Sequence, residues 1–405
     1  MDKDALAHRD ALANRNRLLA NAFHALPLKH RLRRAALFDI ARLPLPASRF
    51  TSMNRLLLIR PDHLGDVLLT TPAIRALRAA RPYMEIHALV GPWSADVLSN
   101  YPELDFVLTL PFPGFSREPK SDWRSPYEMA IRSAAQLRRI GYGSAVILRP
   151  DHWWGALVAK LAGIPLRIGY DLPDVAPLLT QKLPHEHRHV VMQSLRLVEH
   201  WTGEVSPDDA PYTFAVIDSD RAYIRSYLAE WDITPEQPVI AIHPGSGTWV
   251  KHWDEQKWAS VADTLSGQLD AIVVFTGGDH EMALVQRIVE LMRERACVMV
   301  GDTRVGQLAA LFERAKVVLG PDSGPLHLAV AVSAPTVTFF GPADPAEFGP
   351  WGDPPKHFVL TSDIACRPCR VLDWGMDDPK NHPCVREITV ARVLDAARRA
   401  VHYMD

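Results

Sequence analysis

The sequence is informative first through what it lacks. Only four of its 405 residues are cysteine, too few for a disulfide framework, so the cytoplasm is the default compartment. It has no apolar run of about 18 residues that would span a membrane, and residues 1–20 lack the apolar core of a signal peptide. The net charge is −2, so the chain lacks the basic excess that a dedicated nucleic-acid binder usually has. The chain is long enough for two domains.

Two nucleotide-binding fingerprints are also missing. No G-x-G-x-x-G follows the first expected strand, which argues against an ordinary NAD enzyme. No G-x-x-x-x-G-K-[ST] is present either, which excludes a Walker A loop. The two halves show no obvious repeat.

Positive charge is concentrated at the start of the chain. Residues 1–50 carry ten Lys or Arg against four Asp, and Arg31, Arg33 and Arg34 cluster in a segment of helical spacing. Such a basic helix can lie on the inner face of the cytoplasmic membrane. The alternative, somewhat favoured, is a helical extension that packs on a domain or on another subunit.

Strands alternate with helices through the rest of the chain, which predicts parallel sheets covered on both faces. We expect an α/β protein with two Rossmann-like, doubly wound domains and a ligand cleft between them. Pro-rich polar stretches around 207–211 and 234–238 suggest where one domain ends and the other begins. The expected parts are a basic helical extension over 1–50, an N-terminal domain over 51–215, an interdomain region over 216–237, a C-terminal domain over 238–388 and a terminal helix over 389–405.

The expected elements follow from apolar periodicity and from Gly and Pro boundaries. Expected strands cover 55–60, 85–90, 106–110, 145–148, 239–243, 271–275, 298–300, 316–319, 336–340 and 357–360. Expected helices cover 4–20, 28–43, 67–80, 94–100, 127–140, 219–230, 255–266, 280–294, 305–314, 326–332 and 390–402.

Asp66 is the sharpest candidate in the first half. It lies where a strand turns into a helix, and the positive end of that helix would favour a carboxylate that acts as a general base. Alternatively, it is a capping residue that contributes about 1 kcal/mol of helix stability. Asp62 and His63 in the same loop could bind substrate or could be solvated loop residues.

Three strand ends in the second half carry groups suited to a nucleotide. Gly245 and Gly247 would let the backbone approach a phosphate, and three polar side chains could donate to it: Ser246, Thr248 and Lys251. Asp279 suits ribose hydroxyls, and Asp322 suits a hydroxyl or a helix cap. Ser323 and Gly324 open an expected helix whose N-terminus favours an anion. Each loop could also be an ordinary capped turn, but together they favour a nucleotide-binding half opposite an acceptor half.

A cysteine loop follows the last expected strand. Cys366 and Cys369 are spaced as C-x₂-C, and His382 and Cys384 come later. The spacing is only partly that of a structural zinc or iron site. We favour a reduced cluster that organises the loop.

Four blocks together resemble glycosyltransferase family 9, the bacterial heptosyltransferases of lipopolysaccharide core synthesis. The blocks are LLLIRPDHLGDVLLTTPAIRALR, IAIHPGSGTWVKHW, FTGGDHE and GPDSGPLHLAVAVSAPTVTFFGPADP. The resemblance implies a GT-B fold and inverting transfer, typically of heptose from ADP-heptose, without an essential metal. The acceptor would be lipopolysaccharide core, another glycan or glycolipid, or a protein.

The resemblance also implies roles for individual residues. Asp66 would be the catalytic base, and the donor diphosphate would contact Ser246, Lys251, Ser323 and Gly324, with His327 nearby. Asp322 would face the donor ribose or sugar, and Asp279 the ribose hydroxyls. Residues 1–50 lie outside the usual family core, and a similar cysteine loop holds iron in some protein heptosyltransferases.

Two other functional classes stay open from the sequence. One is a GT-B-like nucleotide-sugar epimerase, which would turn over its nucleotide sugar without an acceptor. The other is a non-catalytic nucleotide-sugar-binding protein, which would bind ADP and need no base at Asp66.

Overall fold

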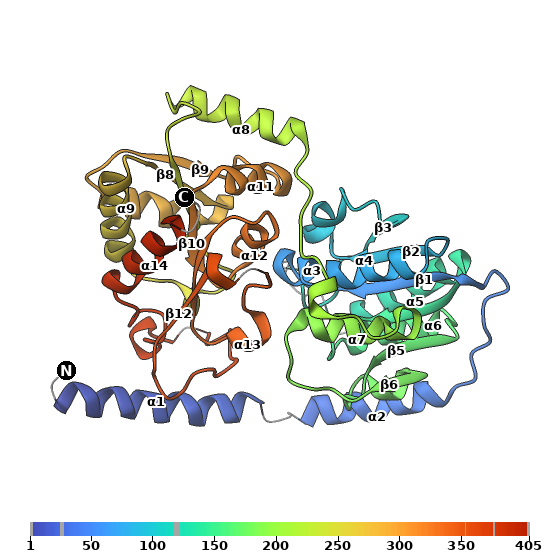
Figure 1. Cartoon of the computed structure of the whole chain (residues 1–405). Coiled ribbons are helices and arrows are strands. Elements are labelled where there is room, and N and C mark those ends of the chain that lie inside the picture. The colour runs from blue at the N-terminus through green and yellow to red at the C-terminus, as the bar shows by residue number, and fades with distance from the viewer. Residues whose placement is uncertain are drawn as a thin grey trace. The chain divides into compact units, whose positions relative to one another are not determined.

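The computed structural model describes residues 3–24, 28–116, 122, 124–352, 354–375 and 377–402. Its contacts divide the chain into two compact units (Figure 1). The N-terminal unit runs from α2 (Leu28–Arg42) to Pro211. The C-terminal unit contains α1 (Lys3–His24) and the chain from Tyr212 onward.

The N-terminal unit is built on a six-stranded parallel sheet with the order β3-β2-β1-β4-β5-β6. Its strands are β1 (Ser52–Arg60), β2 (Glu85–Val90), β3 (Phe106–Thr109), β4 (Tyr142–Ile147), β5 (Leu166–Tyr170) and β6 (Gln181–Leu183). Its later helices are α3 (Leu64–Leu68), α4 (Thr71–Ala80), α5 (Ser125–Ile140), α6 (Trp153–Leu161) and α7 (Val190–Thr202), with 3₁₀ turns η1 (Pro92–Leu98), η2 (Ala176–Leu178) and η3 (Pro207–Asp209). Residues 56–60 of the central strand β1 and all of β4 are buried, because helices cover both faces of the sheet.

The C-terminal unit has a second six-stranded parallel sheet, with the order β12-β11-β10-β7-β8-β9. Its strands are β7 (Val239–Ile242), β8 (Ile272–Gly277), β9 (Ala296–Val300), β10 (Val317–Pro321), β11 (Thr336–Phe340) and β12 (His357–Thr361). Its later helices are α8 (Asp218–Glu230), α9 (Glu255–Leu269), α10 (Met282–Glu290), α11 (Val305–Arg314), α12 (Gly324–Ala331), α13 (Pro345–Phe348) and α14 (Val390–His402). Its 3₁₀ turns are η4 (Trp249–Lys251), η5 (Asp279–Glu281), η6 (Pro354–Lys356) and η7 (Pro379–Asn381).

Both sheets follow the doubly wound order, in which the third strand of each half lies at an edge and the first and fourth strands lie side by side. The prediction of two doubly wound parallel-sheet domains is therefore confirmed. α8 falls within the segment 216–237, where the sequence suggests an interdomain region. It packs through Ile224 and Leu228 into the C-terminal unit's core, and its Arg221 pairs with Glu313 of α11 at 2.7 Å.

The two helices of the N-terminal extension dock on different units. From α1, Arg9 pairs with Glu387 at 2.8 Å and Arg15 with Asp377 at 2.7 Å. From α2, Arg33 and Arg34 both pair with Asp174. The side chain of Arg31 lies outside the described residues.

Packing on the domains is thus the observed arrangement of both helices, and contact with a membrane stays a prediction. Among the helices that the structure describes, none has both the length and the apolar character to cross a bilayer.

Some local expectations were wrong. The single helix expected over 67–80 is two helices, with a break at Leu69–Thr70 just before Pro72 in the first turn of α4. Pro lacks an N–H and is favoured at a helix start, which explains the break. The helix expected over 94–100 is the 3₁₀ turn η1, and the one expected over 280–294 begins as η5 and ends at Glu290.

Candidate active site

The predicted site residues gather at the switch point of each sheet. In a doubly wound sheet, ligands bind at the carboxyl ends of the two central strands, where the order reverses. In the N-terminal unit these strands are β1 and β4, and Asp66 follows β1. In the C-terminal unit they are β7 and β10, which Lys251 and Asp322 follow. The fold therefore places both candidate half-sites where such sheets bind ligands.

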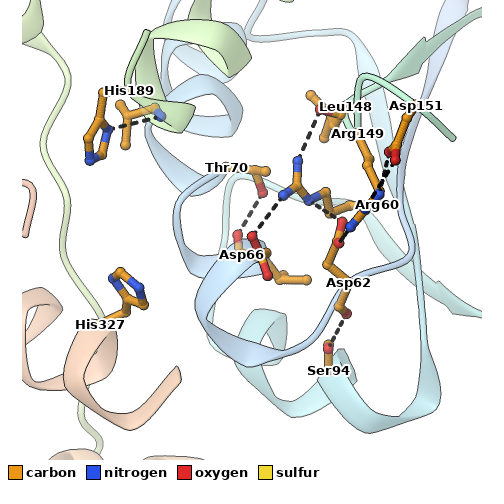
Figure 2. Close-up of polar contacts among 12 residues, drawn as sticks. Arg60, Asp62, Asp66, Thr70, Ser94, Leu148, Arg149, Asp151, His189 and His327 are labelled. Atoms are coloured by element: carbon orange, nitrogen blue, oxygen red, sulfur yellow. Dashed lines mark hydrogen bonds and ion pairs between the residues drawn. The ribbon is translucent and has the colours of Figure 1, made fainter. Parts of the chain in front are cut away.

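Asp66 lies in the first turn of the five-residue helix α3. The Asp66 side chain is 37% exposed, and its Oδ1 is 3.2 Å from a terminal nitrogen of Arg60 (Figure 2). His63, the residue before α3, makes no side-chain hydrogen bond that caps this helix. The carboxylate is thus accessible and is held by a cation from the end of β1.

Asp62 is buried, which neither interpretation of it from the sequence expected. Its side chain is 3% exposed and lies between Arg60, whose Nε is 2.7 Å from Oδ2, and Arg149, which donates to Oδ1 (Figure 2). Burial alone would raise the pKa of Asp62, but the guanidinium groups of Arg60 and Arg149 lower it below its ordinary value. Asp62 is therefore a buried carboxylate inside a cationic network.

Arg149 connects this network to the end of β4. Its Nε also donates to Asp151 at 2.6 Å, and its guanidinium lies over the ring of Phe115. His152 follows, fully buried, and burial lowers its pKa to about 3. The buried imidazole is therefore neutral at physiological pH.

In the C-terminal unit, Lys251 and Asp322 form a buried ion pair across the switch point. Lys251 Nζ is 2.6 Å from Asp322 Oδ2 and 3.0 Å from the Asp322 carbonyl oxygen. His327 Nε2 is 3.6 Å from Oδ1. Burial would raise the pKa of Asp322, but Lys251 and His327 lower it to about 2. The structure thus brings three predicted donor-site residues together, and the Asp322 carboxylate faces the other two.

The two glycines of the loop after β7 have different surroundings: Gly245 packs closely against Glu281, and Gly247 has free space beside it. A Cβ on Gly245 would lie 1.8 Å from Glu281 Oε1, whereas one on Gly247 would meet nothing within 4 Å. Ser246 Oγ donates to the Thr248 carbonyl at 2.7 Å, and Thr248 Oγ1 donates to a carbonyl at 2.5 Å. In this structure the two hydroxyls shape the loop, and the buried Glu281 supports it.

Ser323 differs from these two residues. Its Oγ is buried without a hydrogen-bond partner, and as the N-cap residue of α12 it makes no side-chain cap. Gly324 begins α12, so the first N–H groups of the helix lie beside this hydroxyl. Asp279 is exposed in the first turn of η5, at the end of β8.

The cysteine loop brings three thiols to one small cavity. Cys366, Cys369 and Cys384 line this cavity, and burial raises the pKa of Cys384 to about 12. His382 Nε2 lies 2.8 Å from Asp377. Within the described ranges, no group of three or more His, Cys, Asp or Glu is placed to hold a metal ion. A zinc or iron site at these residues is therefore not confirmed and stays a prediction.

From the sequence, Arg149 was placed at a strand end where such sheets bind ligands, but neither Arg60 nor Arg149 was given a role. Each is a charged residue at the end of an apolar strand run, LLLIR and VILR. A cation in that position is costly to bury without a partner, and this was the signal that a carboxylate would be found beside it.

Comparisons with known proteins agree with this architecture. The sequence model described as glycosyltransferase family 9 (heptosyltransferase) matches residues 131–374, a range that includes every donor-site candidate but begins after Asp66. Lipopolysaccharide heptosyltransferase 2 of Escherichia coli is 24% identical over 305 residues, which cover 72% of this chain and 84% of that protein. Lipopolysaccharide heptosyltransferase 1 of Pseudomonas aeruginosa is 26% identical over 317 residues, covering 78% and 86%.

Solved structures share the fold. The family 9 glycosyltransferase of Veillonella parvula has a TM-score of 0.73 at 23% identity, covering 89% of this chain and 99% of that one. ADP-heptose lipopolysaccharide heptosyltransferase II of Escherichia coli has a TM-score of 0.68 at 22% identity, covering 86% and 99%. The predicted GT-B fold is confirmed.

Proposed function

Because the chain belongs to glycosyltransferase family 9 (heptosyltransferase), we propose that it transfers heptose from ADP-heptose to a hydroxyl of lipopolysaccharide core. The curated relatives named above support this acceptor, since their names place them in lipopolysaccharide synthesis. The Escherichia coli enzyme of similar fold supports the donor, since it is named for ADP-heptose. We further propose a cytoplasmic location, because four cysteines form no disulfide framework.

Asp66 is the proposed general base, and its half-exposed carboxylate at the switch point is the observation that carries the mechanism. It accepts the proton of the acceptor hydroxyl while that oxygen attacks the anomeric carbon from the face opposite ADP. The new carbon–oxygen bond forms as the bond to the diphosphate oxygen breaks. Configuration at the anomeric carbon is inverted, and ADP leaves with the bonding electrons.

The donor half supplies positive charge where negative charge develops. Lys251 is already held in place by Asp322, and the first N–H groups of α12 point out of its N-terminus. We propose that the diphosphate contacts these groups together with Ser246, Thr248, Ser323 and Gly324. His327 would lie beside the phosphates, Asp322 beside the donor sugar or ribose, and Asp279 at the ribose hydroxyls.

The test uses the full chain, ADP-heptose and lipopolysaccharide that lacks core heptose. We expect release of ADP that depends on the acceptor, and we expect Asp66→Asn to abolish it while the Kd for ADP changes less than about twofold. Wild-type turnover by Asp66→Asn would exclude the proposed base.

The same assay separates the alternatives. Conversion of the nucleotide sugar without an acceptor would indicate an epimerase. ADP binding without turnover on lipopolysaccharide, glycan or protein acceptors would indicate a non-catalytic binding protein. Transfer to protein alone would change the acceptor but keep the mechanism.

A further inference from the structure

Each of the three nitrogens of the Arg60 guanidinium lies close to a different oxygen atom, the two terminal nitrogens in hydrogen bonds and Nε in an ion-pair contact. One terminal nitrogen donates to the Leu148 carbonyl oxygen at 3.0 Å, Nε lies 2.7 Å from Asp62 Oδ2, and the other terminal nitrogen lies 3.2 Å from Asp66 Oδ1 (Figure 2). The guanidinium is planar and rigid. Two of these contacts therefore fix the direction of the third, which is the contact to Asp66.

The two fixing contacts join groups that are almost completely buried. The side chains of Arg60 and Asp62 are 5% and 3% exposed. Leu148 directly follows β4, which pairs with β1 across the switch point. Arg60 is thus anchored to the central strands of the sheet.

Two guanidinium groups share one buried carboxylate in this network: that of Arg60, 5% exposed, and that of Arg149, 34% exposed. The shared carboxylate is that of Asp62. One carboxylate cannot neutralise two cations. The remaining positive charge is met by the two more exposed carboxylates at the edge, Asp66 beside Arg60 and Asp151 beside Arg149. Asp66 is therefore part of the charge balance of the network.

The helix that carries Asp66 needs such support. α3 has five residues, and no side chain caps its N-terminus at His63. A helix this short has few hydrogen bonds of its own to hold it in place. An ion pair to a buried, rigid partner limits how far the carboxylate can move.

We propose that Arg60 is a positioning residue for Asp66, and that Asp62 and Arg149 serve to hold Arg60 in the orientation that this requires. The proposal rests on the proposed role of Asp66 as the base. Arg60 itself needs no contact with substrate. It would fix the carboxylate oxygen at the place where the acceptor hydroxyl must present its proton, and a displacement of about 1 Å can cost about a hundredfold in rate.

The test compares substitutions of Arg60 with a matched control on the same strand. Arg55, near the other end of β1, also forms an ion pair to a carboxylate, Glu85 at 2.7 Å, and a hydrogen bond to a carbonyl. We expect Arg60→Met to lower kcat about a hundredfold and Arg60→Lys about tenfold, because lysine keeps the charge but not the planar fork. The KM for ADP-heptose should change less than about twofold in both. Arg55→Met should keep kcat within about twofold of wild type.

The outcomes separate this proposal from the proposed function. If Asp66→Asn is inactive while Arg60→Lys and Arg60→Met keep the wild-type kcat, the positioning role is wrong and the base assignment survives. If Asp66→Asn is active, both fail. If Arg60→Met does not fold, Arg60→Lys decides: a tenfold loss of kcat at an unchanged Kd for ADP supports the proposal, and a wild-type kcat overturns it.

Discussion

The ion pairs at the two switch points differ in how far their carboxylates are exposed. In the N-terminal unit the acid, Asp66, is 37% exposed, and its cation, Arg60, is buried. In the C-terminal unit both Lys251 and Asp322 are largely buried, at 13% and 7% exposed. The first arrangement leaves a carboxylate available to accept a proton. The second fixes a cation in place before any anion arrives, so the cost of ordering Lys251 is met in folding and not in binding.

This comparison predicts a large difference in stability between two Asp→Asn substitutions. Asp322→Asn leaves Lys251 buried without its counter-charge, and we expect a loss of about 3 kcal/mol. Asp66→Asn removes an exposed partner, and we expect a loss below about 1 kcal/mol. Denaturant unfolding measures both. Equal losses would mean that the two pairs do not differ in the way their burial suggests.

The two helices of the extension are held on their units by different kinds of contact. α2 places Leu37 in the core of the N-terminal unit. Among the described side chains of α1, the small Ala13 is the one in the main core of the C-terminal unit, and α1 is held by arginine ion pairs. We expect Leu37→Ala to destabilise the N-terminal unit by about 3 kcal/mol. Hydrogen exchange should rise within residues 28–211 and stay unchanged after Tyr212. The neighbouring Phe38 is 47% exposed, so Phe38→Ala is the control and should have little effect.

His152 makes part of the N-terminal unit's stability depend on pH. Its pKa is about 3 in the folded chain, against an ordinary 6.5, so the unfolded chain binds a proton first as the pH falls. The stabilisation is complete above about pH 6.5 and is lost as the pH falls toward 3, with a slope of up to about 1.4 kcal/mol per pH unit. In His152→Leu the loss of stability between pH 7 and 4 should be smaller. The exposed His200 is the control, since His200→Gln should keep the wild-type slope.

The sequence predicted the architecture better than the contacts at the site. Residues 305–314, 336–340 and 390–402 were assigned to the observed elements with the observed bounds, because their periodicity is strong and their ends are well marked. β5 and β6 were missed because they are short and hold Gly and charged residues among few apolar ones. Neither strand order follows from alternation alone.

Burial of a loop carboxylate was beyond sequence reasoning for a physical reason. Asp62 is stable inside the protein because both Arg60 and Arg149 pair with it. Arg149 lies 87 positions later, and its contact exists only once β1 and β4 are neighbours. Asp66 could be identified as a candidate because the strand-to-helix turn that contains it is visible in the neighbouring residues of the sequence. The Lys251–Asp322 pair joins residues 71 positions apart, so their proximity also had to come from the fold.

The smallest predicted effect concerns Ser323, whose hydroxyl is buried without a hydrogen-bond partner at the N-terminus of α12. Ser323→Ala removes a buried hydroxyl that has no partner, so we expect the free energy of unfolding to stay the same or rise slightly. If this hydroxyl donates to the donor diphosphate, the Kd for ADP should increase about fivefold to tenfold. Ser266→Ala is the matched control, because its hydroxyl donates to the Ala271 carbonyl at 2.7 Å outside the proposed donor site, so its loss should cost about 1 kcal/mol of stability and leave the Kd for ADP unchanged. Isothermal titration of ADP and denaturant unfolding on both variants decide the matter. An unchanged Kd in Ser323→Ala would leave the hydroxyl without a role in donor binding, and the diphosphate would then depend on Lys251, the N–H groups of α12 and the loop after β7.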